Sequence, residues 1–172
     1  MHKFTAWHLV YAVVMAAACM ISYAIIDELL SPFVERPDRL LGGMWAVVAT
    51  VFVFRESRLD SLSAGLSRLI ATCVSFALCM AYILAFPVTG FGIGVVIGVG
   101  TIVMIILGRE EDIVTTGITT TVVLVVAAMN PDHAWQQPPL RLLDTLVGIG
   151  VGVACKWTAS YAFCRAKGVP VR

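Results

Sequence analysis

Apolar residues form six long stretches along the chain, at about 4–26, 40–54, 64–86, 91–107, 113–129 and 140–163. A helix needs about 20 apolar residues to cross a bilayer, within a range of about 17–25. The stretch at 40–54 is shorter than this range, so we expect it to extend into its flanks, tilt or break. The pattern predicts an all-α polytopic membrane protein with six transmembrane helices.

Turn-forming residues separate these stretches. They are Ser31-Pro32, Arg36-Pro37, Pro87 with Gly90, Asn130-Pro131 and Pro138-Pro139. None of the separators is long enough to hold a soluble domain. We therefore expect residues 1–172 to form a single membrane domain.

Composition supports contact with the lipid bilayer. Of the 172 residues, 59% are hydrophobic and only 13% are charged, whereas a soluble domain carries about 25% charged residues. Lys and Arg number 12 against 11 Asp and Glu. This near-neutral balance gives no basic field for nucleic acid, so no nucleic-acid partner is expected.

The distribution of Lys and Arg predicts the orientation, because cytoplasmic loops of membrane proteins are enriched in these residues. With the N-terminus inside, the inner segments hold Lys3, Arg55, Arg58, Arg68, Arg109, Arg165, Lys167 and Arg172. The outer segments hold Arg36, Arg39 and Arg141. Both termini are therefore predicted to be cytoplasmic.

A short motif occurs twice. The third stretch contains Arg68-Leu69-Ile70-Ala71-Thr72 and the sixth contains Arg141-Leu142-Leu143-Asp144-Thr145, so both read R-L-x-x-T. The copies lie three spans apart, and an odd number of spans inverts the second copy. The motif thus predicts two inverted three-helix repeats.

Each motif opens a stripe of polar and small residues at helical spacing. The stripes are Arg68, Thr72, Ser75, Cys79 and Tyr82 in the third stretch, and Arg141, Thr145, Gly148, Gly152 and Lys156 in the sixth. Such faces point toward other helices or water rather than lipid. The glycines, together with Gly94 and Gly98, are better explained as close-packing positions.

Six of these polar residues are candidates for a substrate pathway: Arg68, Thr72, Arg141, Asp144, Thr145 and Lys156. Lys156 lies deep in its stretch, where a charge is costly unless it is paired or extends to the surface. Arg141 and Lys156 are both candidate partners for a salt bridge with Asp144, and spacing does not show either pair. Packing alone also explains such faces.

A charged run, Arg109-Glu110-Glu111-Asp112, joins the fourth and fifth stretches. It is a candidate coupling or ion-pair cluster, although acids before a helix also complement the helix dipole. Threonines at 115, 116, 119, 120 and 121 follow it. They either satisfy backbone carbonyls or line a wet path.

Other chemistry is missing from the sequence. It contains no P-loop, no metalloprotease motif and no nucleophile elbow, so we expect no enzyme, no cofactor, no metal and no catalytic residue. The five cysteines are expected to act as small apolar residues. Trp45 and Trp135 are expected to anchor the helices at the membrane interface.

Several segments together resemble the fusaric acid resistance protein-like (FUSC) family, which is related to aromatic acid exporters and aluminium-activated malate transporters. They are Met44-Trp45-Ala46-Val47, Gly65-Leu66-Ser67-Arg68-Leu69, Gly108-Arg109-Glu110-Glu111-Asp112 with Gly117-Ile118-Thr119-Thr120, and Pro139-Leu140-Arg141-Leu142-Leu143-Asp144-Thr145 with Gly148. The resemblance covers about residues 40–158. Ala71 and Asp144 stand where the family pattern has glycine.

The resemblance implies a six-helix unit that moves small organic anions, either aromatic or aliphatic carboxylates, and works as a homodimer. It also implies a bacterial inner membrane location and efflux. The leading hypothesis is thus a transporter or channel for organic anions. The rival is a non-transporting membrane subunit that dimerises or docks a partner.

Overall fold

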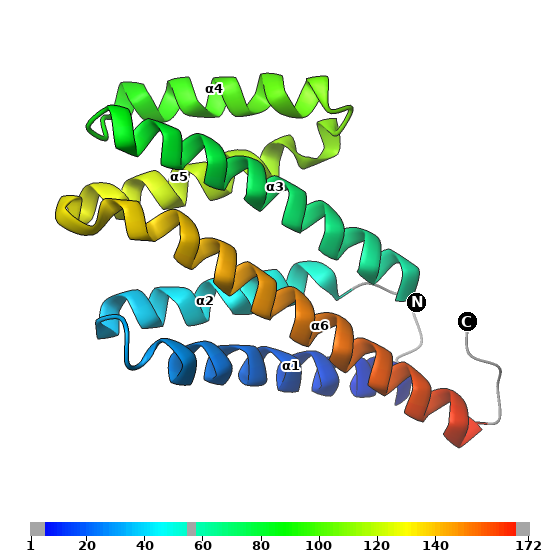
Figure 1. The fold of residues 1–172 in the computed structure, drawn as a ribbon. Coiled ribbons are helices and arrows are strands. Elements are labelled where there is room, and N and C mark those ends of the chain that lie inside the picture. Colours follow the sequence, from blue (N-terminus) through cyan, green and yellow to red (C-terminus); the bar gives the residue numbers. More distant parts are fainter. Residues whose placement is uncertain (1–5, 55–57, 168–172) are drawn as a thin grey trace. The chain divides into compact units, whose positions relative to one another are not determined.

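The computed structural model describes residues 6–54 and 58–167, and these fold into six α-helices (Figure 1). They are α1 (Ala6–Leu30), α2 (Arg36–Val53), α3 (Arg58–Ala85), α4 (Gly90–Ile106), α5 (Ile113–Met129) and α6 (Gln137–Lys167). Two 3₁₀ turns, η1 (Glu110–Asp112) and η2 (Pro131–Gln136), flank α5. No strand occurs in these residues, so the all-α prediction is confirmed for them.

Four helices, α1, α2, α3 and α6, are longer than the apolar stretches that predicted them, whereas α4 and α5 have the predicted length. Two separators, Arg36-Pro37 and Pro138-Pro139, lie inside the first turns of α2 and α6, so their assignment to turns was wrong. The first amides of a helix have no partner within it, and proline therefore fits there without losing a hydrogen bond. Proline at these positions begins a helix rather than interrupting it.

Four segments of the described chain are long and apolar enough to cross a membrane: Leu9–Leu30, Asp60–Ala85, Glu110–Met129 and His133–Tyr161. Helix α4 is apolar but has only 17 residues. Helix α2 has 18 residues and carries Arg36, Asp38 and Arg39 in its first turn. The chain is thus an integral membrane protein, and four of the six α-helices in its described residues provide segments long and apolar enough to span a membrane.

The helices group into two compact units. The first unit combines residues 1–65 with 146–172, so it holds α1, α2 and most of α6. The second unit is residues 66–145, which hold most of α3 together with α4 and α5. Each unit therefore contains two consecutive helices and the larger part of a long helix.

In the first unit, glycines allow α2 to lie close to its neighbours. A Cβ built at Gly148 of α6 would lie 2.3 Å from the Ala46 carbonyl oxygen of α2. A Cβ built at Gly43 of α2 would lie 2.6 Å from the Tyr23 ring of α1. Only glycine fits at this spacing, because real Cβ atoms do not approach other heavy atoms so closely.

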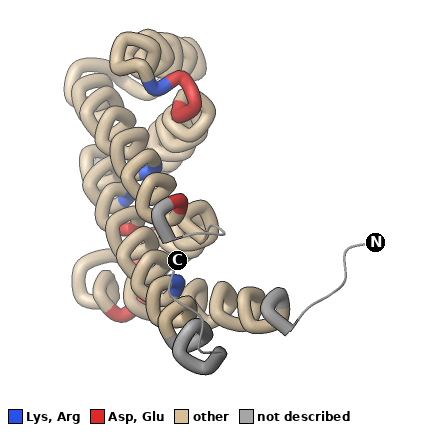
Figure 2. Tube along the Cα trace, turned by 90° about the vertical axis from the view of Figure 1, so that its right-hand side faces the viewer, with Lys and Arg blue, Asp and Glu red and all other residues tan. Residues whose placement is uncertain are grey.

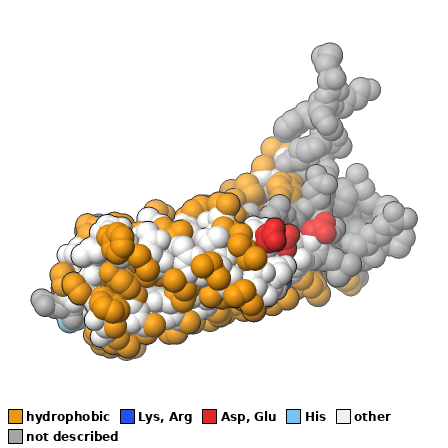
Figure 3. Space-filling model, turned by 90° about the horizontal axis from the view of Figure 1, so that it is seen from above, with side chains coloured by type: hydrophobic (Ala, Val, Ile, Leu, Met, Phe, Trp, Pro, Cys, Tyr) orange, Lys and Arg blue, Asp and Glu red, His pale blue; other side chains and the backbone are white. Residues whose placement is uncertain are grey.

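In the second unit, Cys79, Val96, Val123 and Leu124 form a buried core shared by α3, α4 and α5. A Cβ at Gly92 would lie 1.7 Å from the Tyr82 hydroxyl, so α4 also begins against α3. Gly108 adopts a φ of +67° where α4 ends, which allows a tight turn into η1. Figure 3 shows hydrophobic and uncharged side chains over most of the upper surface, with acidic side chains gathered toward one end.

Candidate functional site

Charged residues occur within the helices as well as at the turn between α4 and α5 (Figure 2). All six candidate pathway residues are buried: Arg68, Thr72, Arg141, Asp144, Thr145 and Lys156. Ser75, Cys79, Gly148 and Gly152 of the two stripes are buried as well. The prediction that these stripes face inward is confirmed for these residues.

Arg141 and Asp144 form an ion pair in the second unit. The Arg141 Nη1 atom lies 2.9 Å from Asp144 Oδ2, and their side chains are 1% and 0% exposed. The two residues are three positions apart in α6, so helix geometry alone brings them together. Of the two partners that the sequence left open for Asp144, the structure shows Arg141.

The two copies of R-L-x-x-T share their local bonding. The Thr72 hydroxyl donates to the Arg68 carbonyl oxygen at 2.9 Å, and the Thr145 hydroxyl donates to the Arg141 carbonyl oxygen at 2.8 Å. The copies differ at the fourth position, where α3 has Ala71 and α6 has Asp144. The two threonines thus satisfy carbonyls within their own helices.

Lys156 lies in an aromatic environment in the first unit. Its ammonium nitrogen is 4.6 Å from the centre of the Tyr11 ring and 5.5 Å from that of Phe54. Both distances suit a cation–π interaction. The Tyr11 hydroxyl donates to the Phe54 carbonyl oxygen at 3.0 Å, which holds the two rings edge to face. Lys156 is only 3% exposed, so its side chain does not extend to the surface.

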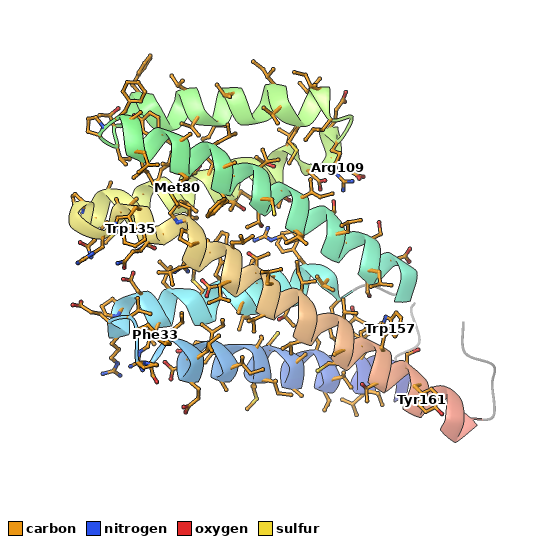
Figure 4. The ribbon with its side chains drawn as sticks, viewed as in Figure 1. Phe33, Met80, Arg109, Trp135, Trp157 and Tyr161 are labelled. Carbon is orange, nitrogen blue, oxygen red and sulfur yellow. The ribbon has the colours of Figure 1, made fainter. Side chains whose placement is uncertain are left out.

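A polar cluster, which we call the latch, consists of Ser67, Arg109 and Asp112. The Arg109 Nε atom donates to Asp112 Oδ2 at 2.7 Å, and Nη2 donates to Ser67 Oγ at 3.1 Å. The Ser67 hydroxyl donates to Asp112 Oδ1. Arg109 lies where α4 turns toward α5 (Figure 4), so the latch joins that turn to α3. Glu110 and Glu111 of the predicted cluster are exposed.

Hydroxyl groups continue from the latch along the contact between α3 and α5, which we call the α3–α5 seam. Thr116 donates to the Asp112 carbonyl oxygen at 2.9 Å, and Ser75 donates to the Thr116 carbonyl oxygen at 3.1 Å. Thr120 donates to Ser75 Oγ at 3.3 Å. Cys79 lies beyond, with its sulfur 3.9 Å from the Thr120 carbonyl oxygen.

The corresponding contact in the first unit, between α2 and α6, has less room. The Thr50 hydroxyl lies 3.0 Å from the Gly148 carbonyl oxygen and 3.0 Å from Ser22 Oγ. A Cβ at Gly152 would lie 3.3 Å from the Thr50 carbonyl oxygen. Here a glycine pair brings backbones together, as the close-packing interpretation of Gly148 and Gly152 expected.

The two tryptophans that were predicted to be interfacial anchors, Trp45 and Trp135, lie in different environments. Trp45 is only 3% exposed, so its assignment as an interfacial anchor was wrong: its ring is packed inside the chain. Trp135 is 53% exposed near the end of η2 (Figure 4), as an anchor requires. Apolar character alone did not distinguish a buried tryptophan from an interfacial one.

Sequence reasoning also missed three residues of these sites. Tyr11 of α1 and Phe54, the residue after α2, lie against Lys156, and Ser67 of α3 completes the latch. The only available signal for Ser67 was its place beside Arg68. No spacing rule connects Lys156 to either aromatic ring.

Comparison with known proteins supports the sequence resemblance. A family model described as fusaric acid resistance protein-like matches residues 24–155. This match covers most of the chain, including the latch, the α3–α5 seam and both R-L-x-x-T motifs. No curated protein and no solved structure matches the chain.

Proposed function

The chain belongs to the fusaric acid resistance protein-like family, and from this premise we propose that it transports small organic anions, aromatic or aliphatic carboxylates, across a bacterial inner membrane. Membrane transport in general is what the family suggests. The choice of organic anions, the direction of efflux and the absence of enzymatic activity are parts of the proposal.

One observation carries the choice of anions: three cationic residues are buried in membrane-spanning helices. Arg68, Arg141 and Lys156 are 3%, 1% and 3% exposed. Such charges are costly inside a membrane and are commonly functional there. The buried Asp144 offsets the charge of Arg141, and the potential of the remaining cations favours an anion and opposes a cation.

An inverted repeat is part of the proposal, and the two units support it. When Arg68 is aligned with Arg141, Ser75 falls on Gly148 and Cys79 falls on Gly152. Ser75 and Cys79 contact α5, whereas Gly148 and Gly152 contact α2. Helices α5 and α2 hold matching places in the two halves, so each stripe contacts the second helix of the other half.

A homodimer also belongs to the proposal. Gly90, Gly94 and Gly98 recur every four residues on α4, and a Cβ built at any of them meets nothing within 4 Å. These glycines are not used for packing within the described chain, unlike Gly148. Small residues at this spacing let two membrane helices approach closely.

One specific feature favours the rival function, a non-transporting subunit. Asp144 balances Arg141, and Asp112 balances Arg109, within the same chain. A buried ion pair of this kind can hold a fold or an assembly in one arrangement without moving a ligand. The rival therefore explains these two acids and the ion pairs that they form.

Reconstitution of the purified full-length chain into proteoliposomes distinguishes the two functions. Vesicles loaded with benzoate, malate or a cation such as choline are followed for efflux after dilution. We expect the protein to accelerate carboxylate efflux and to leave choline retained. Equal release from protein-containing and empty vesicles across the panel would favour the accessory subunit.

A further inference from the structure

The α3–α5 seam differs from the equivalent α2–α6 contact in the groups that separate its helices. The Ser75 and Thr120 hydroxyls bond to each other across the α3–α5 seam. At the α2–α6 contact the Thr50 hydroxyl bonds to the Gly148 carbonyl oxygen, and Gly148 lies directly against the Ala46 backbone. Hydroxyls can exchange a protein partner for water at small cost. A direct backbone contact leaves no room for water.

The α3–α5 seam is partly exposed at the latch and buried beyond it. The Arg109 side chain at the latch is 27% exposed, whereas that of Asp112 is 7% exposed. Ser75, Thr116, Thr120 and Cys79 beyond the latch are all buried. From Ser67 to Cys79 the seam follows twelve residues of α3, which is about 18 Å at 1.5 Å per residue. That is more than half of a hydrocarbon core about 30 Å thick.

We propose that the latch is a gate: a carboxylate from the aqueous side displaces Asp112 from Arg109 and opens the α3–α5 seam to water. This inference rests on the proposed transport of organic anions. It adds the route of the anion through the protein and the way in which that route opens. The displaced group and the incoming group are both carboxylates, so the guanidinium exchanges one charge-assisted hydrogen bond for another.

The geometry fits such an exchange. From a partly exposed position, Arg109 reaches the buried Asp112 through Nε and the half-buried Ser67 through Nη2. The Ser67 hydroxyl donates to Asp112 and can keep that carboxylate hydrogen-bonded after Arg109 turns away. Asp112 therefore keeps one hydrogen-bond donor when Arg109 is released.

Cys79 provides a native reporter at the far end of the seam. In the full-length chain, Cys19, Cys73, Cys155 and Cys164 are replaced by Ala and the protein is placed in lipid nanodiscs, which expose both faces. A membrane-impermeant methanethiosulfonate is added, and modification of Cys79 is followed by intact-protein mass spectrometry. Asp112→Asn tests the latch, and Glu111→Gln is the control with the same change of charge on a neighbouring exposed acid.

We expect Asp112→Asn to modify about tenfold faster than the parent, because loss of a charge-assisted hydrogen bond shifts an equilibrium by about that factor. Glu111→Gln should match the parent, and millimolar benzoate should accelerate modification of the parent. Ser67→Ala should also accelerate it, because the Arg109–Ser67 hydrogen bond that it removes exists only in the closed latch. This variant retains the Arg109–Asp112 pair in case Asp112→Asn fails to fold.

Equal rates in the parent, Asp112→Asn and Ser67→Ala would overturn the gate, as would equal acceleration by Glu111→Gln. Other outcomes distinguish failure of the proposed function from failure of the gate. If latch variants change Cys79 modification but the vesicles release no carboxylate, the gate stands and the transport proposal falls. If the vesicles release carboxylates but no latch variant changes the rate of Cys79 modification, transport stands, the gate is wrong and the anion crosses by another route.

Discussion

At the scale of single residues, the buried ion pair of Arg141 and Asp144 can be tested by removing one partner. Asp144→Ala leaves the Arg141 charge buried without this carboxylate, which lies 2.9 Å away in the native protein. We expect the free energy of unfolding to fall by about 3–5 kcal/mol. Unfolding in mixed micelles, followed by circular dichroism against increasing SDS, gives the measurement.

A double variant separates stability from function at the same pair. Arg141→Met with Asp144→Leu removes both charges and keeps apolar volume, so stability should return close to that of the parent. Glu111→Ala, at an exposed acid, should change stability by less than about 0.5 kcal/mol. If Asp144→Ala is as stable as Glu111→Ala, the pair does not hold the fold.

Transport by the double variant then bears on the pathway. Restored stability with lost carboxylate efflux would place Arg141 in transport, because its structural contribution has been replaced. Restored stability with unchanged efflux would assign the pair to packing. Arg68→Met offers a comparison at the matching position of the other R-L-x-x-T copy.

At the scale of helices, Gly148→Ala tests the contact between α2 and α6. The new Cβ would lie 2.3 Å from the Ala46 carbonyl oxygen, so the backbones must move apart. Overpacking of this kind costs about 1–3 kcal/mol. Gly150→Ala is the matched control, because nothing lies within 4 Å of its Cβ and alanine favours helix. Equal stability of the two variants would contradict the close contact.

Local patterns predicted the helices well because each helix is apolar over most of its length. They predicted their ends less well, since Pro37 and Pro139 are compatible with a first helical turn. They offered Arg141 and Lys156 as possible partners of Asp144 without deciding between them, and the structure shows Arg141. They did not predict the latch or the rings around Lys156, because those contacts depend on how separate helices pack.

At the scale of the whole molecule, the dimer proposal predicts that the open face of α4 is the interface. Gly94→Leu and Gly98→Leu should convert dimers to monomers in native nanodiscs, since a large side chain blocks close approach of two α4 helices. Neither change meets an atom of the same chain, so the monomer should remain folded. Mass photometry measures the outcome, and dimers that persist in both variants would exclude this face.

Helices α2 and α4 pose the remaining question for the whole molecule, namely whether they cross the membrane. Their 18 and 17 residues correspond to about 27 and 26 Å, against a hydrocarbon core of about 30 Å. A bilayer accommodates a mismatch of a few ångströms by thinning, at fractions of a kcal/mol per ångström. The six-span arrangement is therefore physically accessible even though these helices are short.

Single cysteines distinguish six spans from four. If the N-terminus is cytoplasmic, as the distribution of Lys and Arg predicts, Phe33 at the turn between α1 and α2 is outside in either arrangement and Glu110 is inside in either. Phe86, at the turn between α3 and α4, is outside with six spans but inside if α2 and α4 do not cross. All three side chains are exposed, so their cysteine variants should be reachable by an impermeant maleimide.

In right-side-out vesicles we expect Phe33→Cys and Phe86→Cys to be labelled and Glu110→Cys to be protected. Protection of Phe86→Cys together with Glu110→Cys would leave four spans and remove the inverted repeat, because an odd number of crossings would no longer separate its two halves.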